Sequence, residues 1–377
     1  MTGPPTSSVP PSPSPSEDDL VDRLCLLRSR RVGIATYRRL LSEHGSAKAA
    51  LAALPDLARG AGVSDYQPCS RDAALAELRQ GRKAGAQLVA EGTAPYPAAL
   101  TEIPDAPPLF WAMGDLQFLQ RPAIAIVGAR NASSLGRRMA NRLAKQLAAE
   151  GYAVVSGLAR GIDRAAHEGA LADGTIAVQA GGVDTIYPAE NAELAVSIAA
   201  QGLRISEMPM GMTPQARHFP ARNRIISGIA RAVIVVEAAA KSGSLITAAN
   251  VLDYGRDVMA VPGHPFDARA WGCNTLIRDG ATLVRDADDV LEVIGPATAT
   301  VVAPAPATAA PKPDRGLRDI AKLHRMILDR ISPAPVTEDQ LVRDVAACAT
   351  VVAPILVDLE LEGKIVRSAG GMVARNG

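Results

Sequence analysis

AIAIVGARNASSLG, residues 123–136, passes from a short apolar run into a glycine-rich turn and then into the start of a helical pattern. An apolar run this short, closed by a glycine, is typical of a buried strand. After the turn, leucine or methionine recurs every fourth residue from Leu135 to Leu147, and Gly151 follows. That spacing predicts an amphipathic helix whose apolar side covers a sheet, so the stretch indicates an α/β fold.

The same alternation of apolar runs and amphipathic segments continues along the chain. The further runs are YAVVSG (152–157), TIAVQAGG (175–182), LRISEM (203–208), AVIVVEA (232–238) and DVMAVPG (257–263). Parallel sheets with helices on both faces produce this pattern. We therefore expect an extended Rossmann-like, doubly wound parallel sheet over residues 86–296.

A small all-helical domain is expected before the sheet, over residues 19–85. Apolar residues recur at helical spacing in LVDRLCLLRSR, IATYRRLLSEHG and AALAELRQGRKAG, with Gly33, Gly45 and Gly62 as breaks. Residues 1–18 are rich in proline and serine and lack a hydrophobic period, so we expect them to be disordered.

A winged-helix-like domain is expected over residues 317–377, after a Pro/Ala-rich linker at 297–316. LRDIAKLHRMILDRI, VTEDQLVRDV and VVAPILVDLELEG have helical spacing, and KIVRSAGGMVAR is typical of a hairpin turning at Gly370 and Gly371. A recognition helix needs basic or amide side chains. Residues 332–363 hold six carboxylates and a single arginine, so we expect poor reading of duplex DNA.

Composition favours a soluble, cytoplasmic protein. The 377 residues carry a net charge of +1, so any affinity for nucleic acid must come from a local patch. The four cysteines lie far apart without a C-x-x-C pair, which suits neither a disulfide framework nor a zinc site. No segment resembles a signal peptide or a membrane span. We expect no membrane association.

Ligands of doubly wound sheets bind at the carboxyl ends of the strands. Four loops at those ends are rich in glycine: GARNASSLG (128–136), SGLARGID (156–163), GGVD (181–184) and EAAAKSGSLITA (237–248). Each glycine could simply turn a tight corner, but four such loops on one edge indicate an anion-binding rim. Neither the G-x-G-x-x-G nor the G-x-x-x-x-G-K-[ST] pattern is present, so we expect no NAD, ATP or other cofactor.

A local basic patch is expected around HFPARNRIISG, residues 218–228. No carboxylate occurs between Glu207 and Glu237, whereas four arginines do: Arg217, Arg222, Arg224 and Arg231. Arginine forks fit phosphate oxygens, and an exposed ring such as Phe219 offers a face to an unpaired base, which favours single-stranded nucleic acid. The alternative is that Phe219 packs in the core, Pro220 starts the helix, and the arginines are solvated or paired with acids.

Asp163 and His167 stand four residues apart on one helix face, which could suggest catalysis. No serine or cysteine nucleophile motif accompanies them, so we interpret them as an N-cap aspartate and a histidine hydrogen-bonded to it. Tyr187 and Pro188 are expected to fix a loop, and His264 has no second ligand at metal spacing. We expect neither catalytic residues nor a metal site.

Eight segments occur in an informative order. They are VGAR, SGLARGID with the AAH that follows, GGVDTIYP, ISEMP, FPARNRIISG, VVEA with SGSLITA, VPG, and G-x-N-x-L-I-x-D-G-A. This order resembles that of the DprA/Smf family of DNA-processing proteins over about residues 86–294. The flanking domains are also similar to common family architecture, in which the first is of the SAM or helix-hairpin-helix type.

The resemblance implies a non-enzymatic homodimer that binds single-stranded DNA, protects incoming DNA during natural transformation and loads the RecA recombinase onto it. Ala129 departs from the family, where Ser or Thr commonly precedes the arginine, and a family basic residue is displaced to Arg217. The family's DNA pocket corresponds here to Arg130, Phe219, Arg222, Asn223 and Arg224.

With that family in view, we expect phosphates on the loop amides of Gly128, Gly157 and Gly243, neutralised by Lys241 and the arginines. Two other functions are compatible with the fold. A nucleotide-cleaving hydrolase of the LOG phosphoribohydrolase type has a similar fold, but its PGGxGTxxE motif is absent here. A transcription regulator acting through the winged helix would need base-specific binding to duplex DNA.

Overall fold

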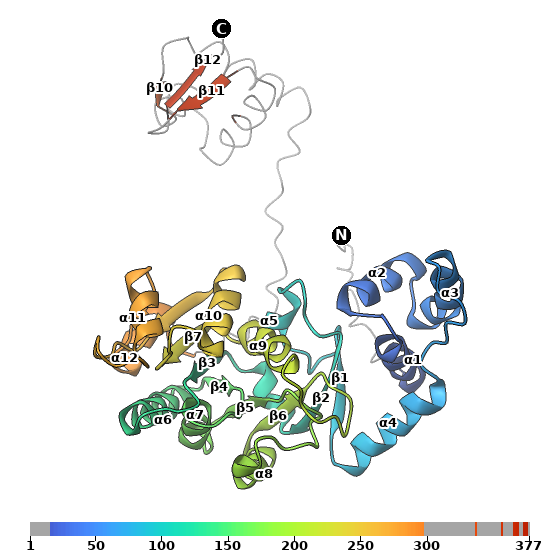
Figure 1. The fold of residues 1–377 in the computed structure, drawn as a ribbon, viewed down its shortest axis with the longest axis horizontal. Coiled ribbons are helices and arrows are strands. Elements are labelled where there is room, and N and C mark those ends of the chain that lie inside the picture. The colour runs from blue at the N-terminus through green and yellow to red at the C-terminus, as the bar shows by residue number, and fades with distance from the viewer. Residues whose placement is uncertain (1–15, 298–335, 338–355, 357–364, 369–371, 376–377) are drawn as a thin grey trace, which may run out of the picture. The chain divides into compact units, whose positions relative to one another are not determined.

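The computed structural model describes residues 16–297, 336–337, 356, 365–368 and 372–375. The chain divides into two compact units, residues 1–299 and 300–377 (Figure 1). Of the segment 1–18, which was expected to be disordered, only residues 16–18 are described. Of the expected linker at 297–316, only residue 297 is described. No helix in the described part of the chain is long and apolar enough to cross a membrane.

Four helices form the N-terminal part of the first unit: α1 (Glu17–Arg28), α2 (Ile34–His44), α3 (Ala47–Gly60) and α4 (Arg71–Lys83). Serine begins three of them, because the hydroxyls of Ser16, Ser46 and Ser70 accept hydrogen bonds from backbone amides three residues on. Three of the helices were expected. The fourth, α3, has Pro55 inside it and was not recognised from the sequence.

A nine-stranded sheet forms the rest of this unit, in the order β1-β2-β6-β5-β4-β3-β7-β8-β9. The expected parallel pairing is confirmed from β6 through β9 in this order. The other end is antiparallel, since β2 pairs in that sense with both β1 and β6, so the sheet is mixed. The strands are β1 (Gln87–Ala90), β2 (Leu109–Gly114), β3 (Ala123–Gly128), β4 (Ala153–Ser156), β5 (Thr175–Val178), β6 (Leu203–Ser206), β7 (Ala232–Val236), β8 (Asp257–Ala260) and β9 (Thr282–Leu283).

Helices cover both faces of the sheet. Alternate residues of β3 point to the two layers: Ile124 and Ile126 pack with α6, α7 and α12, whereas Ala125 and Val127 pack with α5, α9, α10 and α11 (Figure 1). A strand buried on both faces has this pattern. The helical segments are α5 (Ala98–Thr101), η1 (Leu116–Gln120), α6 (Ser134–Ala149), α7 (Ile162–Ala170), η2 (Ala189–Asn191), α8 (Ala192–Gln201), α9 (His218–Ile229), α10 (Gly243–Asp253), α11 (Trp271–Arg278) and α12 (Ala287–Ile294).

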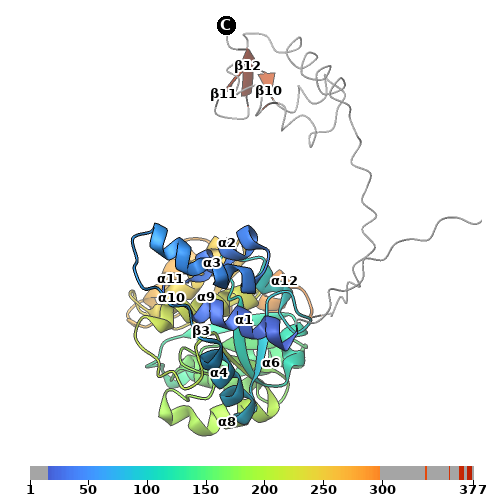
Figure 2. The ribbon, with the colours of Figure 1, turned by 90° about the vertical axis from the view of Figure 1, so that its right-hand side faces the viewer.

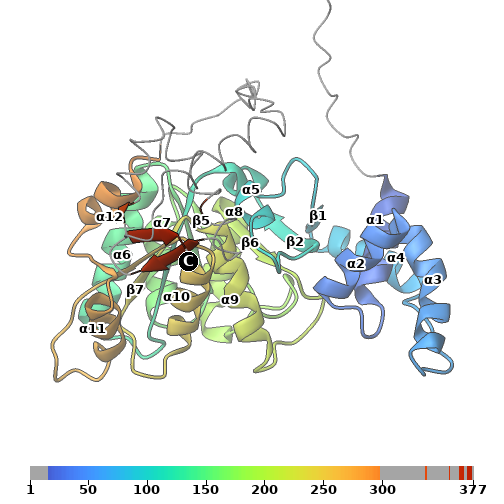
Figure 3. The ribbon, with the colours of Figure 1, turned by 90° about the horizontal axis from the view of Figure 1, so that it is seen from above.

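The helical domain packs at the β1–β2 end of the sheet (Figures 2 and 3). Its anchor is Trp111 of β2, which is buried in a cluster with Leu24 of α1 and Leu78 of α4. Gly81 is required where α4 crosses this ring, because a Cβ there would overlap the indole. The indole Nε1 donates to Glu77 at 2.8 Å, so the contact is polar as well as apolar.

The second unit contains the strands β10 (Val336–Thr337), β11 (Ile365–Ser368) and β12 (Met372–Arg375), paired antiparallel in the order β10-β12-β11. The expected hairpin is confirmed by the pairing of β11 with β12. Val336 and Thr337 were expected to begin a helix and form a strand instead, because they pair with β12. The three expected helices otherwise lie outside the described residues, apart from residue 356.

Candidate nucleic-acid interface

A pocket of about 550 Å³ lies at the carboxyl end of β3. The strand after β3 in sequence, β4, pairs on one side of it and β7 pairs on the other, so this is the switch point of the sheet where ligands of such folds bind. Seven of the ten residues predicted to bind DNA line this pocket: Gly128, Arg130, Phe219, Arg222, Asn223, Lys241 and Gly243. The structure therefore gathers loops that are distant in sequence, and contact with DNA stays a prediction.

Arg130 and Phe219 line the pocket, and Tyr187 contacts Phe219 from outside the lining. We call these three side chains the stack, and the hollow the stacking pocket. The guanidinium carbon of Arg130, an exposed residue, lies 5.1 Å from the centroid of the Phe219 ring, a cation–π distance. The Tyr187 ring lies on Phe219 at 5.8 Å between centroids, tilted by 55°. Tyr187 is half exposed and was expected only to fix a loop. The sequence could have indicated a binding role for Tyr187, because it follows a glycine-rich loop in a chain with few aromatic residues.

Arg222 is buried, which corrects its expected place on a DNA-facing rim. Its guanidinium Nη1 donates to the backbone carbonyls of Gly157, at 2.6 Å, and Val178. Burial lowers the pKa of Arg222 to about 10, and the nearby carboxylate of Asp163 opposes that shift. Arg222 therefore lines the pocket and at the same time links the ends of β4 and β5.

Gly157 also differs from expectation. Its amide donates to the Asp163 carboxylate at 3.1 Å, so it is already bonded within the protein and is not presented to a phosphate. A Cβ at this position would overlap the Arg222 guanidinium. The glycine is therefore needed to make room for that arginine.

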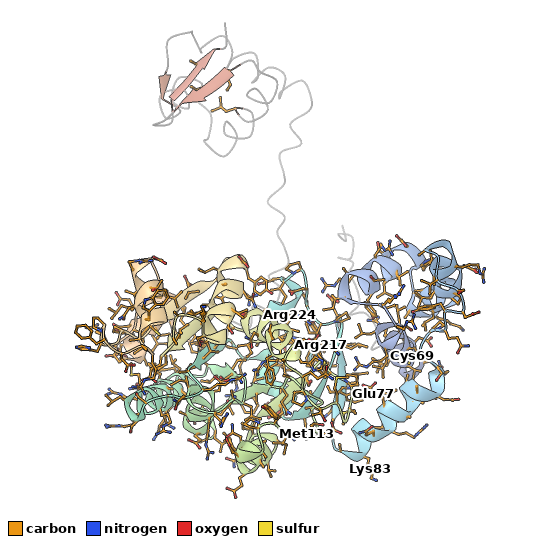
Figure 4. The ribbon with its side chains drawn as sticks, in the orientation of Figure 1. Cys69, Glu77, Lys83, Met113, Arg217 and Arg224 are labelled. Carbon is orange, nitrogen blue, oxygen red and sulfur yellow. The ribbon has the colours of Figure 1, made fainter. Side chains whose placement is uncertain are left out.

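Arg224 and Arg217 do not line the pocket. Arg224 is buried and forms an ion pair with Glu207, while it donates to the Asp105 carbonyl at 2.6 Å. It was expected to face DNA, but α9 turns it away from the pocket into an ion pair inside the protein. Arg217 is exposed just before α9, and Figure 4 shows both arginines near the helical-domain end of the sheet.

The expected pairing of Asp163 with His167 was wrong in detail. Gly161 is the N-cap of α7, and the Asp163 carboxylate accepts from the amides of Gly157 and Ala159. His167 Nε2 accepts from the Leu158 amide at 3.2 Å.

The other ring nitrogen of His167 fixes its tautomer. Nδ1 donates to the Thr175 hydroxyl at 2.7 Å, because that hydroxyl donates its own proton to the Val154 carbonyl. Burial lowers the pKa of His167 to about 3, so the ring is neutral. Both ring nitrogens are engaged, and the side chain supports the loop after β4.

Glu237 occupies the start of α6, a place that the sequence did not reveal. The Ser133 amide donates to its carboxylate at 2.8 Å, and the Ser133 hydroxyl donates as well. Gly136 leaves space for this carboxylate, since a Cβ there would overlap it. Rossmann-type enzymes bind phosphate at the equivalent helix N-terminus. Here an internal anion fills that position.

Comparison with known families agrees with this architecture. The model of DNA recombination-mediator protein A matches residues 87–295. The chain belongs to this family. A DprA-like N-terminal HHH domain matches residues 17–79 and a DprA winged helix domain matches residues 303–371. The expected DprA/Smf membership and three-part fold class are confirmed.

Relatives in the DprA family support the assignment. DNA processing protein DprA of Bacillus subtilis is 44% identical over 56% of this chain and 72% of its own length. Protein Smf of Escherichia coli is 38% identical over 74% of each chain. The X-ray structure of DprA from Streptococcus pneumoniae has a TM-score of 0.55 and 39% identity, covering 63% of this chain and 86% of that one.

A second DprA structure, from Helicobacter pylori, concerns that protein's single-stranded DNA binding mode. It has a TM-score of 0.52 and 29% identity, and covers 55% of this chain and 95% of that one.

Proposed function

We propose that this chain binds single-stranded DNA in the pocket at the end of β3. The observation that carries the proposal is the stack, in which Arg130 and Phe219 line the pocket and Tyr187 contacts Phe219. Aromatic rings and the plane of a guanidinium both accept an unpaired base of any sequence, and the guanidinium adds charge for the adjacent phosphate. Bases inside a duplex are already stacked and cannot use such a platform.

The opposite wall of the pocket suits phosphate. Gly243 is exposed at the first residue of α10, with open space where a Cβ would stand, so a backbone can approach closely. Lys241 is exposed two residues earlier, and the first turn of α10 contains no acid. The positive end of the helix dipole and the ammonium group together favour an anion here.

We infer that the site acts without catalysis. Asp163 and His167, the titratable pair beside the pocket, bond to backbone amides and to Thr175 inside the protein. The LOG-type alternative is disfavoured because its PGGxGTxxE motif is absent from the sequence. Glu237 also fills the N-terminus of α6, where Rossmann-type enzymes bind phosphate. Hydrolysis of a nucleoside monophosphate by the purified protein would reverse this conclusion.

The wider role follows from family membership. We propose that the chain is cytoplasmic, protects incoming single strands in natural transformation, and loads RecA onto them as a homodimer. The family description as a recombination mediator and the Helicobacter pylori relative support the DNA-related part. Sedimentation at micromolar concentration, and RecA filament assembly on coated DNA, test the dimer and the loading separately.

The first expected result is a preference for single-stranded over double-stranded DNA of equal length. Affinity should fall as salt rises, with a slope of log K against log salt of about −0.7 per phosphate contacted, and should depend little on sequence. Fluorescence anisotropy over a salt series measures all three properties. Equal affinity for the duplex, or no salt slope, would contradict the proposal.

The second expected result concerns the stack itself. Arg130→Ala should weaken binding by about 1.5–3 kcal/mol, as for a charge-assisted contact, and Phe219→Ala by about 1–3 kcal/mol, as for one stacked base. Arg278→Ala is the matched control, because this arginine is exposed on α11 and does not line the pocket. Thermal melts should stay near wild type, and an early melt with unchanged DNA affinity would assign the stack a structural role.

A further inference from the structure

A second and larger hollow, of about 1460 Å³, lies along α6 and α7. It joins the first pocket at Arg130 and Asn131, which line both hollows. Apart from Arg130, the residues expected to bind DNA do not line it. Figure 1 shows α6 and α7 packed side by side beneath the sheet. The second hollow is lined by the first half of α6, by α7 and by the loops after β3, β4 and β8, and we call it the groove.

The charge on α6 is strongly biased. This helix of 16 residues has no carboxylate and four basic residues, all exposed: Arg137, Arg138, Arg142 and Lys145. The three arginines line the groove. These arginines are close in sequence, so they present to the groove a strip of positive charge about 7.5 Å long from Arg137 to Arg142, at about 1.5 Å per residue.

The carboxylates of the groove are already engaged. Glu190 pairs with Arg160 at 3.5 Å and Glu168 pairs with Arg164 at 2.7 Å. Asp267 pairs with Arg269, and Glu237 bonds to Ser133 at the start of α6.

Between residues 16 and 297, none of the α6 arginines of the groove forms an ion pair. The lining therefore keeps an excess of positive charge that the protein itself does not neutralise. An anion of extended shape would complement it.

We propose that this groove carries the DNA strand after it leaves the stacking pocket, with the arginines of α6 on its phosphates. The inference rests on the proposed function, because Arg130 is the junction between stack and groove. The described residues that line the groove include no phenylalanine, tyrosine or tryptophan, so the contact is with the backbone and not with bases. The strip suits a short run of phosphates along one strand.

The double variant Arg138→Gln/Arg142→Gln tests the groove. Binding is measured by anisotropy with two oligothymidines, one of about 6 nucleotides, near the small end of known site sizes, and one about four times as long. The short strand should bind as to wild type. The long strand should bind roughly tenfold more weakly, as expected for the loss of two exposed ion pairs, with a salt slope shallower by about 1.4.

The matched control is Arg79→Gln/Lys83→Gln, which removes two exposed charges from α4 at the other end of the unit (Figure 4). Equal weakening by the control would show that net charge matters and would overturn the proposal. Equal weakening for both oligonucleotides would also overturn it. If the groove binds a protein or a second copy of the chain instead, the double variant should match wild type in affinity for both oligonucleotides. That result would also overturn the proposal.

Failure of the groove is distinguishable from failure of the proposed function. If wild type binds neither oligonucleotide, the proposed function fails, and with it the groove. If wild type binds both and the double variant matches it, only the groove fails. If the double variant melts early, the single variants Arg138→Gln and Arg142→Gln replace it as the test of the groove. Each should change the salt slope by half as much as the double variant.

Discussion

Arg224→Ala is expected to lower the free energy of unfolding by about 3–5 kcal/mol, the usual loss when one partner of a buried ion pair is removed. Arg224 and Glu207 have side chains only 11% and 14% exposed. Without the guanidinium, the Glu207 carboxylate would lose its ion-pair partner and keep only the more distant charge of Arg28, and the Asp105 carbonyl would lose its donor. Urea unfolding followed by circular dichroism measures the change.

Two comparisons show whether the ion pair causes this loss. Glu207→Gln removes the charge, so Arg224→Ala/Glu207→Gln should be more stable than Arg224→Ala alone. Burial raises the pKa of Glu207 in the folded protein, so protonation at low pH favours folding and this contribution is lost as pH rises through the folded pKa. Losing Arg224 raises that pKa further. The deficit of the variant should therefore narrow as pH falls, and a deficit independent of pH would contradict the mechanism.

Local sequence patterns predicted much of the fold because the neighbouring strands in the middle of the sheet are buried on both faces. Such strands are continuous apolar runs, as in the stretch that contains Ile124 and Ile126. The antiparallel end is different. There β2 pairs with β1 on one side and with β6 on the other, and β6 follows β2 by about ninety residues in the chain. A local sequence pattern does not show that two segments so far apart pair antiparallel. The same limit hid α3, since Pro55 lowers helical propensity locally while packing retains the helix.

The candidate site was predicted in part for a related reason. The interval without acids around α9 indicated free arginines, yet Arg222 and Arg224 find their acids in other segments, at Asp163, Glu207 and Asp105. Two residues apart on a helix, they also point to different sides. Phe219 and Asn223, four apart, line the pocket together. Helical periodicity could therefore have separated Arg224 from the pocket, but burial of Arg222 required the fold.

Arg222→Ala is the other change with a large expected effect, about 2–6 kcal/mol in the free energy of unfolding, the sum for two buried carbonyls left without a donor. Two buried carbonyls, of Gly157 and Val178, would lose their donor, at about 1–3 kcal/mol each. Asp163 would also lose the nearby positive charge that favours its ionised form. Chemical unfolding measures the loss. Addition of Asp163→Asn should recover part of it.

Unlike Arg130→Ala, this variant should lose stability and DNA affinity together. Arg222 holds the loop after β4 through the Gly157 carbonyl, and that loop supports the one that carries Arg130, because the Ile162 amide donates to the Ala129 carbonyl at 3.2 Å. Displacing that support would move the stack away from its place over the pocket.

Arg222→Lys tests whether the positive charge alone is sufficient. Lysine keeps the charge but lacks the planar guanidinium that bonds both carbonyls, so it should restore little of the stability or the DNA affinity. Unfolding curves and anisotropy on the same preparations of both variants measure the two losses side by side. If Arg222→Ala keeps wild-type stability and loses only DNA affinity, Arg222 is a direct DNA contact, and its burial in the free protein must be relieved when the strand binds.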